Sequence, residues 1–508
     1  MPSRNRPRSL TGVSISLLLW MLFGVVQPAS PSVPETVVET VPLDVATLAP
    51  TRAARAGPAT LDLPAETWSR AQQLCAPFRF TMVGFTWRGA EQADAALTWG
   101  GGFIRAEGDP DDGPDVGSSE YSGIRGTAPV WTGDTRCISV KVRTGSGAPL
   151  RGLRATFINT SGTAEDPSAL VGVGTAFVRA WSDLASMWSP APAFAWTTKP
   201  AIRSRAQWGA NEKLRQCAPY YMDSVQVSYI HHTATGNSYS KGQTDDLIRG
   251  IYAYHVKSLD YCDIAYHFVV DKWGRIWEGR FGGVNKNVRG GHAAGFNTGS
   301  VGISVLGTYT NRTPGSDLLA SLRQLVRWRM DLAHVKPNGY SYLTSAGGGS
   351  SKYKAGQRVK LRSVIPHRRT SYTSCPGDQL ARRVDSIRDG AARSGHPKIY
   401  RPKQSSKQLV HAQTTVRLRG TASKDTARWS IAISNGSGDV VQTFSGTGTT
   451  IDRTWDGTAD GVPVPDGDYR ARYTATWRGE DARPATLTIR VCTTPNPSTG
   501  LCPAPPSP

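Results

Sequence analysis

The sequence predicts a multidomain protein with a central α/β domain and flanking parts built from β-strands. A chain of 508 residues is too long for one hydrophobic core, so two to four domains are expected. In residues 200–396, segments with helical apolar spacing alternate with short apolar runs typical of strands. Residues 63–188 and 411–492 instead contain short alternating runs separated by turns, which indicate an N-terminal β-sandwich and a C-terminal Ig-like β-sandwich.

The central segment has three predicted helices. The first spans residues 243–258: Thr244 is expected to cap it, and acidic residues occupy its first turn. A second helix is expected over residues 316–333, and Pro376 is expected to be the first residue of the third. The strands expected in this segment span residues 225–232, 264–271, 275–280 and 301–306, the middle two forming a hairpin.

The first thirty residues have the pattern of an export signal. Arg4, Arg6 and Arg8 precede an apolar run over residues 10–26, and small residues follow it. This order predicts a secretory signal peptide over residues 1–30 and a secreted or cell-envelope protein. An uncleaved anchor is the alternative, because the run has about 17 residues, and only then is a membrane an expected partner.

Composition marks the other boundaries. Residues 31–62 are rich in Pro, Ala, Thr and Val, and residues 397–410 are basic and polar, so both are expected to be linkers. Residues 493–508 form a Pro-rich tail. The acidic stretch 107–115 lacks the spacing of an EF-hand, and we expect a solvated turn rather than a calcium loop.

The net charge of the chain is +20, from 59 Lys and Arg against 39 Asp and Glu. An exported protein is not expected to bind nucleic acid, whereas anionic polymers of the cell envelope would be attracted by such a charge. The alternative is a basic surface that only keeps the protein soluble.

The cysteines are odd in number. Export permits disulfides, and six of the seven fall as neighbouring pairs, each within one of the predicted segments except that the last pair runs into the C-terminal tail. These pairs are 75/137, 217/262 and 492/502. Other connectivities remain open, except that we expect Cys217 and Cys262 to be bonded. Metal ligation accounts for Cys375, the remaining one, more simply than an intermolecular bridge.

Cys375 is also part of a possible metal site. It follows His367 by eight residues, and a predicted strand far upstream ends at His231 and His232. Two histidines and a thiolate can hold zinc while its fourth position stays open to water, as in catalytic sites. Because neighbouring side chains of a strand point to opposite faces, at most one of His231 and His232 can join this site.

Seven motifs in order resemble peptidoglycan recognition proteins and the related zinc N-acetylmuramoyl-L-alanine amidases (type 2). They are residues 204–209 (Ser-Arg-Ala-Gln-Trp-Gly), 230–233 (Ile-His-His-Thr), 263–268 (Asp-Ile-Ala-Tyr-His-Phe), 277–280 (Trp-Glu-Gly-Arg), 290–292 (Gly-Gly-His) with Asn297, 302–307 (Gly-Ile-Ser-Val-Leu-Gly) and 373–377 (Thr-Ser-Cys-Pro-Gly). The flanking segments resemble accessory parts of actinobacterial members. The resemblance implies a mixed sheet flanked by helices in the central domain.

The resemblance also implies an activity and the residues that carry it. The family's zinc ligands fall on His231, His367 and Cys375, with one Zn²⁺ per chain, and its active-site tyrosine and polar residue fall on Tyr266 and Thr373. Members that only bind peptidoglycan typically lack the cysteine. The expected function is therefore a zinc amidase that hydrolyses the bond between the lactyl group of muramic acid and L-Ala in peptidoglycan.

Two other functions remain as alternatives: a peptidoglycan-binding scaffold with weak or no hydrolysis, and an enzyme that uses Cys375 as a nucleophile. The sequence departs from the family at Arg369, where an acidic residue is common; the resemblance implies that this acid orients a neighbouring group. His232 is expected to lie in the core, and His267 and His292 are candidate groove residues.

Overall fold

The computed structural model describes residues 33–43, 68–89, 93–100, 102–106, 108, 113–144, 150–162, 197–348 and 350–503. From residue 35 onward the described residues belong to one unit. The predicted signal peptide lies outside them, as does most of the predicted linker 31–62. Within the described ranges, no helix has both the length and the apolar character needed to cross a bilayer.

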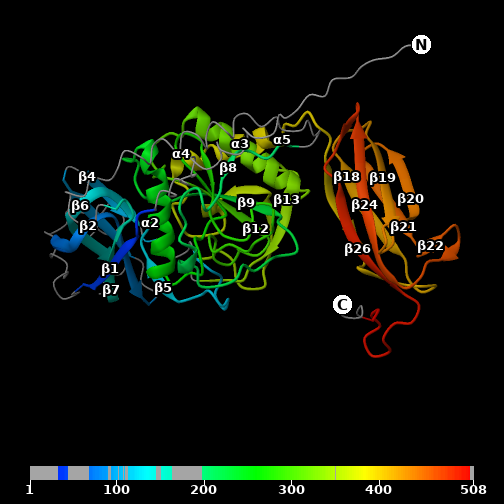
Figure 1. The fold of residues 1–508 in the computed structure, drawn as a ribbon, viewed down its shortest axis with the longest axis horizontal. Coiled ribbons are helices and arrows are strands. Elements are labelled where there is room, and N and C mark those ends of the chain that lie inside the picture. The colour runs from blue at the N-terminus through cyan, green and yellow to red at the C-terminus, as the bar shows by residue number, and fades with distance from the viewer. Residues whose placement is uncertain are drawn as a thin grey trace, which may run out of the picture. The chain divides into compact units, whose positions relative to one another are not determined.

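The central sheet has six strands in the order β15-β9-β12-β10-β11-β8. Figure 1 labels β8, β9 and β12 among them. Neighbouring strands are parallel except β10 and β11, which form the predicted antiparallel hairpin. The sheet is therefore mixed, as the resemblance implied. The strands span Ile202–Arg203 (β8), Val227–His232 (β9), Phe268–Val270 (β10), Ile276–Glu278 (β11), Ser300–Val305 (β12) and Val364–Pro366 (β15).

Two predicted helices agree with the structure to within one residue at each end: α2 (Thr244–Lys257) and α3 (Ser316–Leu332). The cap of α2 was predicted wrongly. Gln243 is the N-cap residue, because a short 3₁₀ turn, Lys241–Gln243, precedes the helix, and the Thr244 hydroxyl donates to the Lys241 carbonyl instead.

The last predicted helix also differs. It is divided into α4 (Asp378–Ala381) and α5 (Val384–Ala392). Pro376 is not the first residue of α4, because Gly377 is the N-cap, with a φ of 81° that favours glycine. The apolar side chains of these two helices are buried; they include Leu380, Val384 and Ile387.

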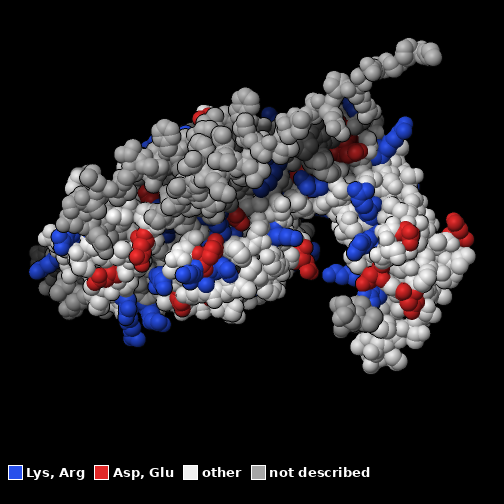
Figure 2. All heavy atoms as spheres, in the orientation of Figure 1, with Lys and Arg blue, Asp and Glu red and all other residues white. Residues whose placement is uncertain are grey.

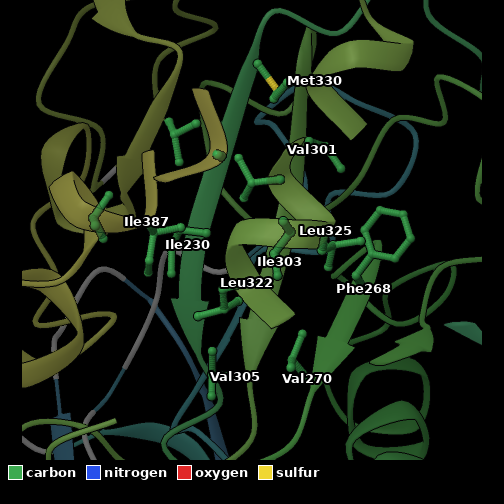
Figure 3. Close-up of a cluster of buried hydrophobic side chains, with 14 of the residues drawn as sticks. Ile230, Phe268, Val270, Val301, Ile303, Val305, Leu322, Leu325, Met330 and Ile387 are labelled. Carbon is green, nitrogen blue, oxygen red and sulfur yellow. The ribbon is translucent and has the colours of Figure 1, made fainter. Parts of the chain in front are cut away.

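Apolar side chains cover both faces of the central sheet. One face packs against α3 and α5, and Figure 3 shows side chains of this cluster. They include Ile230, Phe268, Val301, Ile303, Leu322, Leu325 and Ile387. The other face packs against α2, where Val269 and Trp277 share a cluster with Leu247 and Ile251. Strands β9 and β12 are consequently buried at every residue, as strands covered on both sides are.

The described N-terminal strands form a single antiparallel sheet in the order β1-β7-β2-β6-β3-β4, with β5 on β2. A two-sheet sandwich is not confirmed. Two of the short alternating runs, residues 128–131 and 137–143, contribute to one long strand, because pairing continues past Gly133, whose φ is 66°. The strands span Val37–Pro42 (β1), Gln72–Arg88 (β2), Ala93–Trp99 (β3), Gly102–Ala106 (β4), Ile124–Gly126 (β5), Val130–Thr144 (β6) and Arg151–Asn159 (β7). Strand β1 thus lies in the predicted linker 31–62.

The C-terminal strands form a three-stranded sheet, β16-β18-β21, a larger sheet, β17-β26-β24-β19-β20 with β25, and the pair β22-β23. The two larger sheets share one hydrophobic cluster. The predicted linker 397–410 is not a linker here, since it contains β16 and β17. The strands span Ile399–Gln404 (β16), Gln408–Val410 (β17), Val416–Ala422 (β18), Arg428–Ser434 (β19), Val440–Thr447 (β20), Thr450–Trp455 (β21), Thr458–Ala459 (β22), Val462–Pro463 (β23), Gly467–Trp477 (β24), Glu480–Asp481 (β25) and Ala485–Cys492 (β26). The Ig-like assignment stays a prediction.

Three disulfides join the cysteine pairs that the sequence favoured, so this prediction is confirmed. They are Cys75–Cys137, Cys217–Cys262 and Cys492–Cys502. Cys375 lies outside the disulfides and is buried.

Helix α2 contacts the N-terminal sheet as well as the central one. The Tyr254 hydroxyl donates to the Phe85 carbonyl over 2.9 Å, and Met82 belongs to the same hydrophobic cluster as the helix. The backbones approach closely: a Cβ on Gly250 would lie 2.9 Å from Met82, and one on Gly84 would lie 2.2 Å from the Tyr254 ring. The N-terminal strands therefore pack directly on the domain that carries the predicted site.

Candidate metal centre

The three predicted ligands come together at one end of the central sheet. Strand β15 runs parallel to β9 with Pro366 opposite Ile230, so His367 and His231, the next residues, lie side by side. Cys375 reaches them from the loop before α4. The ligand atoms of the three residues all lie within 4.8 Å of one another, and the three side chains are buried.

The chemistry of this group suits zinc. Burial lowers the pKa of His231 to about 3, so its imidazole is neutral and keeps a lone pair for a metal. His231 Nδ1 lies 3.7 Å from the Cys375 sulfur. Imidazole nitrogen and thiolate sulfur are both ligands of zinc, and three protein ligands leave one position for water or substrate.

The second nitrogen of His231 has its own partner. His231 Nε2 lies 3.1 Å from His292 Nδ1, and His292 Nε2 lies 3.4 Å from the Ser300 hydroxyl. With hydrogen on Nε2, His231 donates to His292 and keeps the Nδ1 lone pair on the side of Cys375. Partners of this kind fix the orientation of metal-binding histidines.

A buried amide and a buried carboxylate hold His292. Asn297 Oδ1 accepts from the backbone N–H of His292 over 2.7 Å. Asp115 Oδ1 accepts from Asn297 Nδ2 over 2.8 Å and from the Gly295 N–H over 2.7 Å. Burial raises the pKa of Asp115, while these hydrogen bonds oppose the shift. Asp115 therefore lies inside the protein and not in the solvated turn that the sequence predicted.

Tyr266 and Thr373 line a cavity of about 490 Å³. The candidate ligands are not among its lining residues, but their chain neighbours His232 and Ser374 are. The ring centroid of Tyr266 lies 5.4 Å from that of His231. The Thr373 hydroxyl accepts from the backbone N–H of Cys375 over 3.1 Å.

The other histidines singled out in the sequence bond to groups inside the domain. His232 is buried, as expected, and its Nδ1 accepts from the Tyr309 N–H over 3.2 Å. The prediction that His267 and His292 line a groove is wrong, because both are buried and bonded within the domain. His267 Nε2 lies 2.6 Å from the Val288 carbonyl, and its Nδ1 accepts from the Gly302 N–H.

Arg369, at the position where the resemblance implied an acid, is exposed. Its neighbour Arg368 supports the ligand loop instead. The Arg368 guanidinium donates to the carbonyls of Ser374 and Cys375 and pairs with Asp378.

The burial and the hydrogen bonds of Asp115 were not predicted from the sequence, because its partner Asn297 is 182 positions away along the chain.

Comparison with known proteins identifies the family of this chain. Residues 221–378 match the family model described as N-acetylmuramoyl-L-alanine amidase. A peptidoglycan-recognition protein of Drosophila melanogaster is 30% identical over 162 residues, which are 32% of this chain and 74% of that protein. The chain therefore belongs to the family of peptidoglycan recognition proteins and type 2 amidases.

Other relatives include peptidoglycan-recognition protein 1 of Holotrichia diomphalia, which is 28% identical over 187 residues, 37% of this chain and 80% of that protein. Among solved structures, peptidoglycan recognition protein-LE in complex with tracheal cytotoxin has 27% identity and a TM-score of 0.30. The match covers 37% of this chain and 94% of that structure.

Proposed function

We propose that the protein is an exported zinc-dependent N-acetylmuramoyl-L-alanine amidase. It cleaves the amide bond between the lactyl group of muramic acid and L-Ala of the stem peptide. The observation that carries this proposal is the buried group of His231, His367 and Cys375, with ligand atoms within 4.8 Å of one another. Family membership supports the reaction, since the matched family model is described by this activity.

The metal would be held by His231 Nδ1, a ring nitrogen of His367 and the Cys375 sulfur. When bound, zinc supplies Lewis acidity and lowers the pKa of a coordinated water toward neutrality. The protein's own residues supply the rest. His292 holds the ring of His231, and Arg368 holds the loop of Cys375 through two backbone carbonyls.

Tyr266 and Thr373 are placed to stabilise charge on the substrate. Each carries a hydroxyl, and both line the same cavity. We propose that these hydroxyls donate to the carbonyl oxygen of the scissile amide as it becomes negative, and that Tyr266 also assists removal of the proton from the attacking water. Such donors act more strongly in a site that excludes water.

Peptidoglycan is the proposed partner. The relative of known structure, protein-LE, is titled as a complex with monomeric diaminopimelic acid-type peptidoglycan, and we extend binding of this class of ligand to the present chain. Anionic envelope polymers are a second proposed partner. On the face drawn in Figure 2, Lys and Arg side chains occur in several groups between Asp and Glu, so the charge of +20 is not concentrated in one patch there.

We also propose secretion and a role for the flanking segments. The three disulfides support an oxidising compartment. The proposed parts are a signal peptide (1–30), an N-terminal β-sandwich (63–188), the amidase domain (200–396), an Ig-like domain (411–492) and a Pro-rich tail (493–508). We propose that the flanking β-rich parts position the enzyme on the envelope.

Mass spectrometry of digested peptidoglycan tests the function. The wild-type protein should release stem peptides with a new L-Ala amino terminus, and Cys375→Ala should release none and lose its zinc. His396→Gln, a change of a half-buried histidine whose Nδ1 lies 3.0 Å from Glu480, is the control and should behave as wild type. A wild-type protein that binds zinc and muropeptide but releases no new amine would be a scaffold.

Chelation separates zinc catalysis from a cysteine nucleophile. Dialysis against a chelator should abolish hydrolysis, and added zinc should restore it. Full activity in metal-free protein, lost on alkylation of Cys375, would instead establish covalent catalysis. The burial of the Cys375 sulfur between two imidazoles favours ligation.

A further inference from the structure

The cavity beside the candidate metal centre is lined by two parts of the chain. Tyr266 and Thr373 come from the region that matches the family model, which begins at residue 221. Six other lining residues precede that region and belong to the N-terminal sheet or its connections. They are Asp94, Arg105, Gly108, Thr127, Ala128 and Pro129. The family match therefore does not account for one wall of this cavity.

Hydrogen bonds fix this wall to the central domain. The N–H of Trp131 donates to the Thr235 carbonyl over 2.9 Å, just after the strand that carries His231. The Ser122 hydroxyl donates to the Leu259 carbonyl over 2.8 Å. Trp131 is also part of the hydrophobic cluster around α2. Ser122 and Trp131 precede and follow residues 127–129 in the sequence, so their hydrogen bonds hold these lining residues in place.

The described lining residues of the cavity carry charges of both signs. Asp94 is the one carboxylate among these described residues, and it accepts from Arg143 over 2.5 and 2.9 Å and from the Gly108 N–H over 3.1 Å. Arg105 and Lys352 also line the cavity. Arg105 and Arg143 thus share the carboxylate of Asp94.

The side chain of Arg105 is held by its ion pair with Asp94. Its guanidinium donates to Asp94 over 3.0 Å, and its side chain is 39% exposed. Guanidinium groups bind carboxylates through directed, charge-assisted hydrogen bonds, and a guanidinium held in advance loses less entropy on binding. The ligand that suits this wall is a peptide with a free carboxylate that lies across the cavity toward Tyr266.

We propose that Arg105 of the N-terminal sheet binds a free carboxylate of the stem peptide while the muramoyl end of the peptide lies at the metal centre. This inference rests on the proposed function and adds a specificity-determining residue from outside the family-matched region. The N-terminal sheet accordingly belongs to the substrate-binding site and distinguishes stem peptides with free carboxylates from those with amidated ones.

Arg105→Gln tests the proposal, with Arg79→Gln as a matched control. Arg79 lies in the same sheet, is 40% exposed and pairs with Asp134 over 2.9 Å, but it does not line the cavity. The substrates are one soluble muropeptide with free carboxylates and its amidated form. Arg105→Gln should raise KM for the free acid about tenfold with little change in kcat, and should leave KM for the amidated form near wild type.

Arg105→Lys keeps the charge and should recover part of the lost affinity, while equal melting temperatures for the Arg105 and Arg79 variants show that folding is intact. Calorimetric binding of both muropeptides to proteins that also carry Cys375→Ala separates this proposal from the proposed function. Weaker binding of the free acid caused by Arg105→Gln supports the role of Arg105 even if wild type hydrolyses nothing. Equal effects on both ligands, or none on either, would overturn it.

Discussion

His292 Nδ1 lies 3.1 Å from His231 Nε2, and the other nitrogen of His231 lies 3.7 Å from the Cys375 sulfur. The two ring nitrogens of His231 thus face different partners, one in the candidate metal centre and one in the interior of the domain. His292 acts as a positioning residue for His231, because it contacts this candidate metal ligand and does not itself line the cavity.

Replacement of His292 by Gln should weaken zinc binding about 10- to 100-fold, as loss of such a partner typically does. Competition with a chromophoric chelator measures this affinity directly, without reference to activity. His255→Gln is the control, since His255 is also buried but bonds to the Ala265 N–H. Equal zinc affinity in both variants would show that His292 does not position His231.

Asp115 should be important for stability. Asp115→Ala removes the acceptor of the Gly295 N–H and of the Asn297 side chain, and should lower the free energy of unfolding by about 2–4 kcal/mol. Asp115→Asn keeps one oxygen acceptor and should cost less. Urea unfolding of the two variants checks the order, and equal losses would contradict the proposed hydrogen bonds.

Tyr266→Phe should lower kcat about 100- to 1000-fold, the usual cost of losing a donor to a developing oxyanion. Zinc content should not change, because the ring of Tyr266 stays in place. Tyr340→Phe, at an exposed position on β13 (Tyr340–Thr344), is the matched control. Wild-type turnover by Tyr266→Phe, measured as release of new amines, would remove Tyr266 from the mechanism.

Acid should destabilise the metal-free protein through its buried histidines. The pKa of His267 is lowered from 6.5 to about 3, chiefly by burial and also by Arg280 and Arg329, while the hydrogen bond to the Val288 carbonyl opposes the shift. Between these values the unfolded chain binds a proton that the folded protein does not. The stabilising contribution is therefore complete above pH 6.5 and falls as the pH falls toward 3. Urea unfolding in a chelator at several pH values measures the slope, which should be shallower in His267→Gln.

The sequence predicted the parts of the central domain that follow from local pattern. Val227–His232 lies within a predicted strand, and α2 and α3 within predicted helices. His231, His367 and Cys375 were proposed as a group from the resemblance and from the odd cysteine, and the fold places them within reach of one another. These features depend on residues close in sequence or on ordered motifs.

Other features depend on contacts that no local pattern contains. Asp115 looks like a surface residue because its neighbours in sequence are acidic, and only the fold places Asn297 against it. The basic composition of residues 397–410 indicated a linker, yet Lys398 is buried because its ammonium lies 3.1 Å from Asp331. A distant carboxylate thus converts an apparent solvent-facing charge into part of a packed region.

The close approach of α2 to the N-terminal strands restricts how this chain can change in evolution. Gly84 and Gly250 are small because Tyr254 and Met82 occupy the space beside them. An ancestor that exchanged its N-terminal strands by recombination would also have had to exchange this face of the helix. Lineages that retain the strands should therefore inherit both glycines together with their bulky counterparts.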